Sequence, residues 1–592
     1  MNEEDIIKAV KSATEVEVSS RTDDVVLEAA RRKAAEMKSG ATPRGTRPLR
    51  GRRMMQAVAV AAGILVVCGL TLVAAPGVMD TLLNYFKGPT GFRESLPALE
   101  MPQKHFKGQP GGPSGGDVGG TTAPLDMPYK AILFKYYPDN PLISTDDESA
   151  SVFAADVDTG SYTIARRFFR DGHIPMRDAV RTEEFVNYFN YDYTPPSRET
   201  FSVHIEGAPS KFARYKTGYQ LLRIGIRAKE IPADKRKNAN LVLVVDVSAS
   251  MANGDRIHLV RESLRHLLDA LRPEDTVAVV AFGESAYTAL SPTAMKNKDE
   301  IIGAVETLIP SEALDVTNLE AGMTLAYKIA DGMFDREKIN RVILCSDGYA
   351  NKGKTGPYSI LDEIQREAAR GIYLTTAGFG MGNYNDYLME QMADNGDGQY
   401  FYIDTNEEAR RVFVKDLAGT LQVVAKDVKV SVNFNPDTVS RYRLIGYENR
   451  RIGDKDSSGA DGGDIGAGQS MTALYEMKFR EAAEPGRVAT LTITYTDPDS
   501  GKTHELKKEI AAGAFGDSFE KASTGLRLAA CVAQFAGILR ESYWAEESGF
   551  SDILPVIRKI LEEREDDADV IELLNFVRRA GSSDPAVPTD SP

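Results

Sequence analysis

Cysteine and histidine are scarce in this chain. Its 592 residues include three cysteines, Cys68, Cys345 and Cys531, and six histidines. The cysteines lie far apart in the sequence, so the chain contains no Cys-x-x-Cys pair and no Cys/His cluster. These absences exclude a disulfide framework and the usual structural zinc sites. Sites built from oxygen atoms, which suit hard divalent cations, remain open.

Positive charge is in the minority and is unevenly distributed. The formal net charge of −15 argues against a general nucleic-acid binder. Between Arg31 and Arg53, however, nine Lys/Arg residues accompany a single acid, Glu36, so this block carries +8 and the rest of the chain carries −23. The meaning of the block depends on the segment that follows it.

An uncharged apolar run follows the basic block directly. Met54 to Ala75 is 22 residues long, with Gln56 as its one strongly polar side chain, and this length suffices for a membrane-spanning helix. Because Lys and Arg crowd only its N-terminal flank, we expect a single-pass protein of the cytoplasmic membrane, with residues 1–53 in the cytoplasm and the main domains outside. A signal peptide cleaved after Ala75 is the alternative, and both Pro76 and the long preceding segment argue against it.

The remainder is long enough for several domains, at roughly 100 to 200 residues each. From residue 240, strand-like and helix-like segments alternate for about 180 residues, beginning with the apolar run Leu241 to Val245. This alternation predicts an α/β doubly wound domain, in which ligands bind at the carboxyl ends of the strands. Strand-like sequence lies on both sides of it, so we expect the flanks to pair into one antiparallel sheet or sandwich with the α/β domain inserted between its strands.

The predicted organisation follows from these segments. It comprises a cytoplasmic basic tail (1–53), a transmembrane helix (54–75), a flexible Gly/Pro linker (76–127), an N-terminal extension of helices and strands (128–239), the α/β domain (240–420), a β-rich C-terminal extension (421–515), C-terminal helices (516–581) and a disordered tail (582–592). Five aromatic residues are crowded into one short stretch and are expected in the core, namely Phe185, Tyr188, Phe189, Tyr191 and Tyr193. Cys345 and Cys531 are expected to be buried as small apolar residues.

Five oxygen-bearing side chains are predicted to meet at the carboxyl edge of the α/β sheet. Asp246, Ser248 and Ser250 directly follow the apolar strand, and because residues two apart point the same way, they can converge on one point. Thr317 opens a later helix, and Asp347 follows a second apolar strand. Carboxylates and hydroxyls together are ligands for Mg²⁺, Mn²⁺ or Ca²⁺ and not for zinc or copper.

This pattern resembles the metal-ion-dependent adhesion site (MIDAS) of the von Willebrand factor type A (VWA) domain, which reads Asp-x-Ser-x-Ser, a distant Thr and a later Asp-Gly. The resemblance assigns five residues to a divalent cation, Mg²⁺ first and Mn²⁺ or Ca²⁺ as alternatives: Asp246, Ser248, Ser250, Thr317 and Asp347. It also implies a protein partner that offers an Asp or Glu carboxylate to the ion. Two positions depart from the pattern: Ala249 stands where the family often has Gly, and Asp315-Val316 replaces small residues before the threonine. A carboxylate at Asp315 would weaken the capture of an acidic ligand.

The resemblance extends beyond the motif. The stretches VFAADVDTGSYTIARRF and VKVSVNFNPDTVSRYRLIGYENR are similar to a group of bacterial membrane-anchored VWA proteins that carry an N-terminal and a C-terminal extension. Similar stretches are spread over most of Ser151 to Phe479. The resemblance therefore implies the same domain order as the segments above.

Three functions are compatible with the sequence. The first is a metal-dependent protein-binding module that is displayed outside the membrane and is not an enzyme. The second is transmembrane signalling, in which a helix predicted over Asp24 to Lys38 contacts a cytoplasmic partner. The third, less favoured, is a hydrolase with a metal or a serine centre. A serine centre would use Ser248 or Ser250 with His258 as the base, and it is disfavoured because neither serine lies in a Gly-x-Ser-x-Gly turn. No catalytic residue, organic cofactor or nucleic-acid partner is expected, and the sequence does not name the protein partner.

Overall fold

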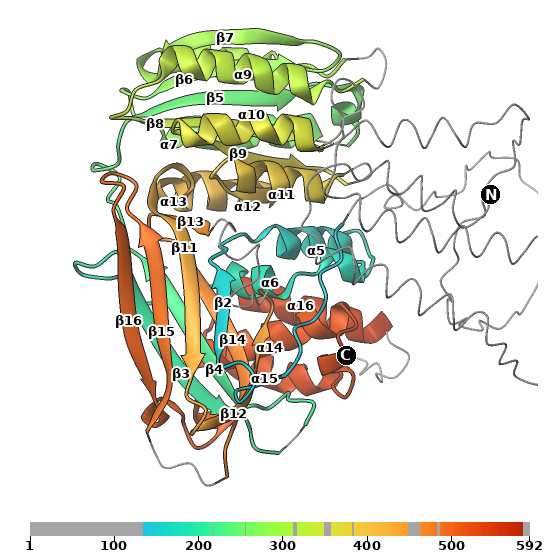
Figure 1. Ribbon diagram of the computed structural model, residues 1–592. Helices are drawn as coiled ribbons and strands as arrows, with labels where there is room; N and C mark the ends of the chain where they lie inside the picture. Colours follow the sequence, from blue (N-terminus) through green and yellow to red (C-terminus); the bar gives the residue numbers. More distant parts are fainter. Residues whose placement is uncertain are drawn as a thin grey trace, which may run out of the picture. The chain divides into compact units, whose positions relative to one another are not determined.

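The computed structural model describes residues 134–215, 217–254, 256–311, 316–348, 357–381, 384–447, 462–481 and 486–583 (Figure 1). The predicted cytoplasmic tail, membrane span and linker, together with residues 584–592, lie outside these ranges. Within the ranges described, no helix has both the length and the apolar character that crossing a membrane requires. The predicted span at 54–75 therefore stays a prediction.

A six-stranded sheet forms the centre of the α/β domain, in the order β10-β9-β8-β5-β6-β7. Neighbouring strands are parallel except for β7, which pairs antiparallel with β6 at one edge. The strands are β5 (Ala239–Asp246), β6 (Thr276–Phe282), β7 (Ala286–Ala294), β8 (Ile339–Ser346), β9 (Ile372–Phe379) and β10 (Tyr400–Ile403). Strand β5 is buried along its whole length, as its apolar run predicted, because both faces of a parallel sheet are covered.

Helices cover both faces of this sheet. Along β5, Leu241, Leu243 and Val245 pack in one apolar cluster, whereas Val242 and Val244 pack in a second. The first cluster takes side chains from α7 (Arg256–Ala270), α8 (Lys298–Glu306), α12 (Asn406–Arg410) and α13 (Leu417–Leu421), and the second from α5 (Gly160–Arg170), α9 (Leu319–Met333), α10 (Pro357–Ala369) and α11 (Asp386–Asn395). The α/β doubly wound prediction is confirmed. Successive side chains of β5 point to opposite faces of the sheet, so they pack alternately in the two clusters.

Two elements of this domain differ from the sequence prediction. The antiparallel edge strand β7 was not predicted, because most of its side chains are partly or fully exposed and it lacks an apolar alternation. The last helix of the predicted alternation is broken into α12, a five-residue π-helical turn at Arg411–Lys415, and α13. Local periodicity detects neither an exposed edge nor a change of helix type.

The segments on either side of the α/β domain form two antiparallel sheets. One has the order β1-β12-β14-β4-β3, and the other has the order β13-β11-β15-β16 with β2 also paired to β11. The strands are β1 (Ile143–Ser144), β2 (Ala150–Ala154), β3 (Phe201–Pro209), β4 (Tyr219–Ala228), β11 (Val423–Phe434), β12 (Val439–Ile445), β13 (Gly463–Gly466), β14 (Ser470–Phe479), β15 (Arg487–Thr496) and β16 (Thr503–Ala511). Strand β4, which precedes the α/β domain, pairs with β14, which follows it, and β2 pairs with β11 in the same way. The α/β domain is thus inserted between parts of one β structure, in agreement with the prediction.

Five helices pack together beside these strands. Side chains of α5, α6 (Thr182–Tyr188), α14 (Thr524–Leu539), α15 (Phe550–Glu563) and α16 (Ala568–Ser583) share one apolar cluster. The five aromatic residues of 185–193 lie in this cluster and are at most 7% exposed, so their predicted core position is confirmed. Cys345 and Cys531 are also buried. The predicted C-terminal helices (516–581) include α14, α15 and α16. Asp566, between α15 and α16, has a φ of 65°, which is outside the range of a right-handed helix.

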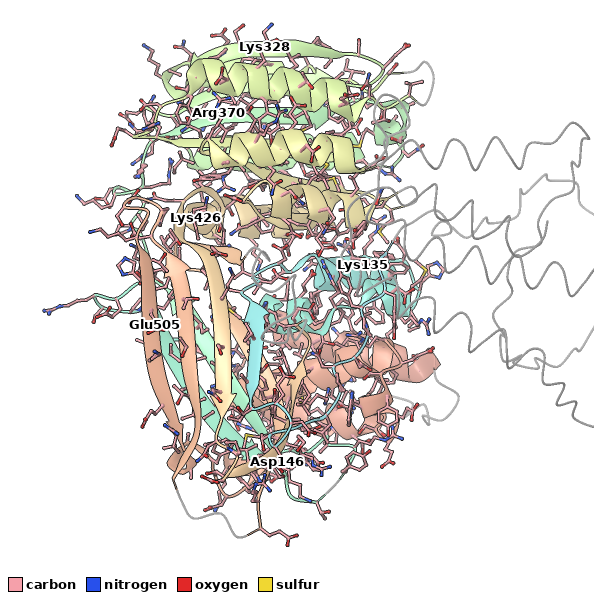
Figure 2. All side chains as sticks on the ribbon, viewed as in Figure 1. Lys135, Asp146, Lys328, Arg370, Lys426 and Glu505 are labelled. Atoms are coloured by element: carbon pink, nitrogen blue, oxygen red, sulfur yellow. The ribbon has the colours of Figure 1, made fainter. Side chains whose placement is uncertain are left out.

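Ion pairs join the extensions to the α/β domain. Arg166 of α5 donates from Nε to Asp404 at 2.9 Å and from Nη2 to Glu408 at 2.9 Å. Lys426 of β11, labelled in Figure 2, pairs with Asp397 and lies 4.9 Å from the ring centre of Tyr373 in β9. These pairs place charged side chains of both extensions against the loops and strands of the inserted domain.

Candidate metal centre

The predicted site begins where β5 ends. Asp246 is the last residue of that strand, Ser248 follows in extended conformation, and Ser250 lies in a short 3-10 turn, Ala249–Ala252. The backbone between them is fixed, because Val247 N donates to Phe282 O at 2.8 Å and Val247 O accepts from Ser311 N at 2.8 Å. The loop therefore presents its side chains from an anchored backbone.

The two later residues reach the same edge from neighbouring elements. Asp347 follows β8, the strand that lies beside β5. Thr317 lies just before Asn318, whose side chain caps α9 and whose N–H donates to Gly283 O at 2.7 Å. Gly283 directly follows β6, the other neighbour of β5. Asp347 and Thr317 thus lie at the ends of the two strands that flank Asp246.

All five predicted ligands are buried. Their exposed fractions are 0% for Asp246, 1% for Ser248, 4% for Ser250, 0% for Thr317 and 0% for Asp347. Ser248 Oγ lies 3.1 Å from Ser250 Oγ, and Ser248 N donates to Asp246 Oδ1 at 2.9 Å. Two carboxylates and three hydroxyls at one sheet edge form an oxygen donor set, which fits a hard divalent cation.

The electrostatics of the site also favour a cation. Burial and, after it, the negative charge of Asp347 raise the pKa of Asp246 to about 7, although hydrogen bonds from Ser248 and Ser346 oppose the shift. A bound cation would offset both the lost solvation and the repulsion between the two carboxylates. Among the described residues, no group of three or more His, Cys, Asp or Glu side chains is placed to hold a metal. This site differs from such groups because hydroxyls supply most of its donors.

Ser346 links the two acidic strand ends. Its Oγ donates to Asp246 Oδ2 at 2.7 Å and accepts from Gly348 N at 3.0 Å. Gly348 has a φ of +74°, and a Cβ there would lie 3.0 Å from Asn385 O, so the turn requires glycine. Ser346 was part of the predicted Ser-Asp-Gly sequence, but its bond to Asp246 was not predicted.

Arg256 is a residue of the site that sequence reasoning missed. This first residue of α7 donates from Nη1 to Asp347 Oδ2 at 2.8 Å and to Ser250 O at 3.2 Å, and from Nη2 to Met381 O. A Cβ at Gly380 would overlap the Arg256 side chain, so the arginine passes closely over that glycine. Arg256 therefore neutralises part of the charge of Asp347 in this structure. In the sequence, the only sign of this role is that Arg256 lies shortly after Ser248 and Ser250.

The residues of the hydrolase hypothesis do not come together. The His258 side chain is 65% exposed and lies 3.4 Å from Glu262, and His266 Nε2 lies 2.7 Å from Asn406 Oδ1. In the part of the chain that is described, no hydrogen bond joins a histidine to Ser248 or Ser250. Asp315, which departs from the family pattern, lies outside the described residues.

A second pattern overlaps the site in sequence. Residues 348–355 read G-Y-A-N-K-G-K-T. This sequence matches the Gly-x-x-x-x-Gly-Lys-Ser/Thr pattern of a phosphate-binding loop, which lies between a strand and a helix. Gly348 N is already engaged by Ser346 Oγ, and residues 349–356 lie outside the described part. The described geometry therefore places Gly348 in the turn that carries Asp347 of the candidate site.

The fold and the site define a protein with a VWA domain. The family described as "von Willebrand factor type A domain" matches residues 240–432, and the family described as "von Willebrand factor" matches residues 129–223. A third family, "Uncharacterized protein YfbK, C-terminal", matches residues 419–582. The uncharacterized protein YfbK of Escherichia coli K12 is 34% identical over 448 residues, which cover 71% of this chain and 76% of YfbK. The chain belongs to the YfbK family.

Other similar proteins match a smaller share of this chain. The uncharacterized protein sll0103 of Synechocystis is 25% identical over 304 residues, covering 50% of this chain and 70% of that protein. Human inter-alpha-trypsin inhibitor heavy chain H4 is 32% identical over 164 residues, which cover 26% of this chain and 17% of the human protein. A von Willebrand factor type A structure from Catenulispora acidiphila is 15% identical, covers 66% of this chain and 91% of its own, and has a TM-score of 0.39. VWA domains are typically protein-interaction modules.

Proposed function

We propose that this protein is a metal-ion-dependent protein-binding module displayed outside the cytoplasmic membrane. Asp246, Ser248, Ser250, Thr317 and Asp347 would hold the cation, Mg²⁺ in the first place. The observation that carries the proposal is the burial of three hydroxyls and two carboxylates at the carboxyl edge of β5 and its neighbours. That edge is where doubly wound α/β domains bind their ligands.

The donor set explains why the ion would attract an acidic partner. Three of the five ligands are neutral hydroxyls, and one of the two carboxylates, Asp347, already pairs with Arg256. A divalent cation held this way would keep uncompensated positive charge, which a partner's Asp or Glu carboxylate relieves. Charge complementarity of this kind gives specificity to a protein interface.

Calorimetry with Mg²⁺ or Mn²⁺ tests the site directly. We expect the full chain to bind one equivalent of the ion, and Asp246→Ala and Ser248→Ala to lose that binding, because each substitution removes a donor from a buried set. Ser291→Ala is the matched control, since Ser291 lies exposed on β7. Equal binding by all variants would refute the assignment of the site.

The partner is tested by cross-linking in native membranes. Partners that depend on the ion are recovered with Mg²⁺ present and lost with chelator, and Ser248→Ala shows the chelated pattern in both conditions. Partners recovered equally with and without chelator would contradict metal-dependent binding.

A further inference from the structure

A small cavity lies far from the metal centre, among the strands and helices of the extensions. Its volume is about 50 Å³, several times the ~10–15 Å³ that one water needs. It is lined by residues of β12, β14, α14 and the short 3-10 helix Tyr543–Ala545. None of the five predicted metal ligands lines it.

A buried arginine forms part of the cavity wall. Arg443 of β12 is 8% exposed, and its Nη2 donates to Glu476 Oε2 at 3.2 Å. Its Nε makes no hydrogen bond to any described residue. Burial lowers the pKa of Arg443, and the nearby positive charge of Arg540 acts in the same direction. The guanidinium is thus a buried cation with an unused donor.

The carboxylate that accepts a hydrogen bond from Arg443 has little capacity left. Glu476 Oε1 accepts from Ser210 Oγ at 3.0 Å, while Oε2 accepts from Arg443. Gln534 of α14 supplies a second buried donor, because its Nε2 has no hydrogen-bond partner among the described residues. Two buried N–H donors of the cavity lining therefore lack an acceptor among the described residues.

The charged side chains of the lining have acidic partners, so the two N–H groups without a hydrogen-bond partner distinguish this cavity. Arg443, Arg540 and Lys211 line it, opposed by the carboxylates of Glu476 and Asp139. Lys211 also pairs with Glu520 at 3.1 Å, and Arg540 also donates to Tyr137 O. Arg443 and Gln534 are the two residues whose unused N–H groups belong to the cavity lining.

We propose that this cavity binds the carboxylate group of a small molecule. A carboxylate supplies the acceptors that Arg443 Nε and Gln534 Nε2 lack, and hydrogen bonds between a guanidinium and a carboxylate are among the strongest in proteins. The volume admits a group of that size. Any larger body of the ligand would lie along the adjoining aromatic side chains, because Tyr543 and Tyr215 are 47% and 48% exposed and their rings contact Trp544.

Trp544 provides a direct reporter of occupancy. It is the only tryptophan of the chain, it lines the cavity, and its ring lies 4.5 Å from the Arg443 guanidinium. Excitation at the red edge of the indole band, where tyrosine does not absorb, isolates its emission. Sodium acetate titrated into the full chain is therefore expected to change this emission saturably, and sodium chloride at matched ionic strength is expected to leave it unchanged.

Three variants make the assignment specific. Arg443→Met and Gln534→Leu should each weaken the apparent acetate affinity, by about tenfold or more for the arginine. Arg214→Met is the matched control, because Arg214 stacks 3.8 Å from the ring centre of Tyr543 yet does not line the cavity. Circular dichroism checks each variant for folding. If Arg443→Met does not fold, Gln534→Leu still carries the test, because it removes no charge.

Titration with phenylacetate tests whether the cavity recognises a carboxylate group alone or a larger ligand that carries one. Tighter binding than acetate would show that the ligand extends over the tyrosines, and equal binding would show that the carboxylate alone is recognised. The absence of a saturable response, an equal response to chloride, or an equal response in all variants would show that the cavity holds water, and would overturn the proposal.

Discussion

At the scale of single residues, the candidate metal centre is a balance of buried charges. Asp246 and Asp347 face each other across the ends of β5 and β8, and Arg256 offsets part of their charge. The arginine is itself mostly buried, with 12% of its side chain exposed. A divalent cation bound at the proposed site would therefore compete with Arg256 for the same carboxylate, Asp347.

This competition predicts opposite effects of Arg256→Met on the metal-free and the metal-bound protein. Without metal, we expect the variant to lose about 3 kcal/mol of unfolding free energy, because a buried carboxylate loses its partner. With metal, we expect the Mg²⁺ affinity to rise by about tenfold, because one positive charge leaves the site. Thermal melts with and without Mg²⁺ measure both effects.

Arg265→Met is the control for this experiment. Arg265 lies on the same helix and pairs with Glu306, but both side chains are about half exposed, so its loss should change little. An unchanged Mg²⁺-induced stabilisation in Arg256→Met would contradict the competition.

At the scale of elements, a chain of hydroxyls joins α11 to β10. Tyr400 OH donates to Asp386 Oδ1 at 2.5 Å and lies 2.7 Å from Tyr384 OH. Burial raises the pKa of Asp386 to about 6, the charge of Glu390 adds to the shift, and Arg181 opposes it. The start of α11 thus holds a carboxylate whose charged form the fold disfavours.

The raised pKa gives folding stability a defined pH dependence. The contribution of Asp386 is fully present below its ordinary value near pH 4 and is lost as the pH rises through about 6. Asp386→Asn cannot lose this contribution. Between pH 4 and 7, the fall in unfolding free energy should therefore be smaller in the variant than in the native chain, by about 3 kcal/mol.

Urea unfolding at several pH values measures the difference between the two chains. Asp299→Asn, an exposed acid in the first turn of α8, should retain the native pH profile. A native profile in Asp386→Asn would rule out Asp386 as the titrating group.

At the scale of the whole molecule, the proposed topology places the described domains outside the cytoplasmic membrane. Cys345 and Cys531 are buried, so in a Cys68→Ser background the folded chain offers no native thiol to a membrane-impermeant maleimide. We expect Ser114→Cys, in the predicted linker, to be labelled while the inner membrane is intact. Ser39→Cys, in the predicted cytoplasmic tail, should be labelled only after permeabilisation.

The two labelling sites control for each other, because an intact inner membrane should protect only Ser39→Cys, whereas permeabilisation should expose both sites. Labelling of Ser39→Cys in cells with an intact inner membrane would contradict the proposed orientation. Release of the labelled Ser114→Cys chain into the soluble fraction would instead show cleavage near Ala75.

The sequence by itself determined the features that depend on neighbouring residues. The apolar run of β5, the alternation of strands and helices, and the spacing of Asp246, Ser248 and Ser250 are local patterns, because one strand or one turn sets the direction of each side chain. The position of Asp347 after a second buried strand could be predicted for the same reason, since parallel strands end at one edge of a sheet.

Only the tertiary structure decided the partners of buried charges. Arg256 meets Asp347 from 91 residues away, and Arg443, Gln534 and Trp544 line one cavity from three separate elements. The local sequence pattern of a strand or helix does not encode these contacts, because they depend on how the complete elements pack against each other. The hydrogen bonds and desolvation that follow from that packing set the charge of each site, and with it the chemistry of the ligands we propose.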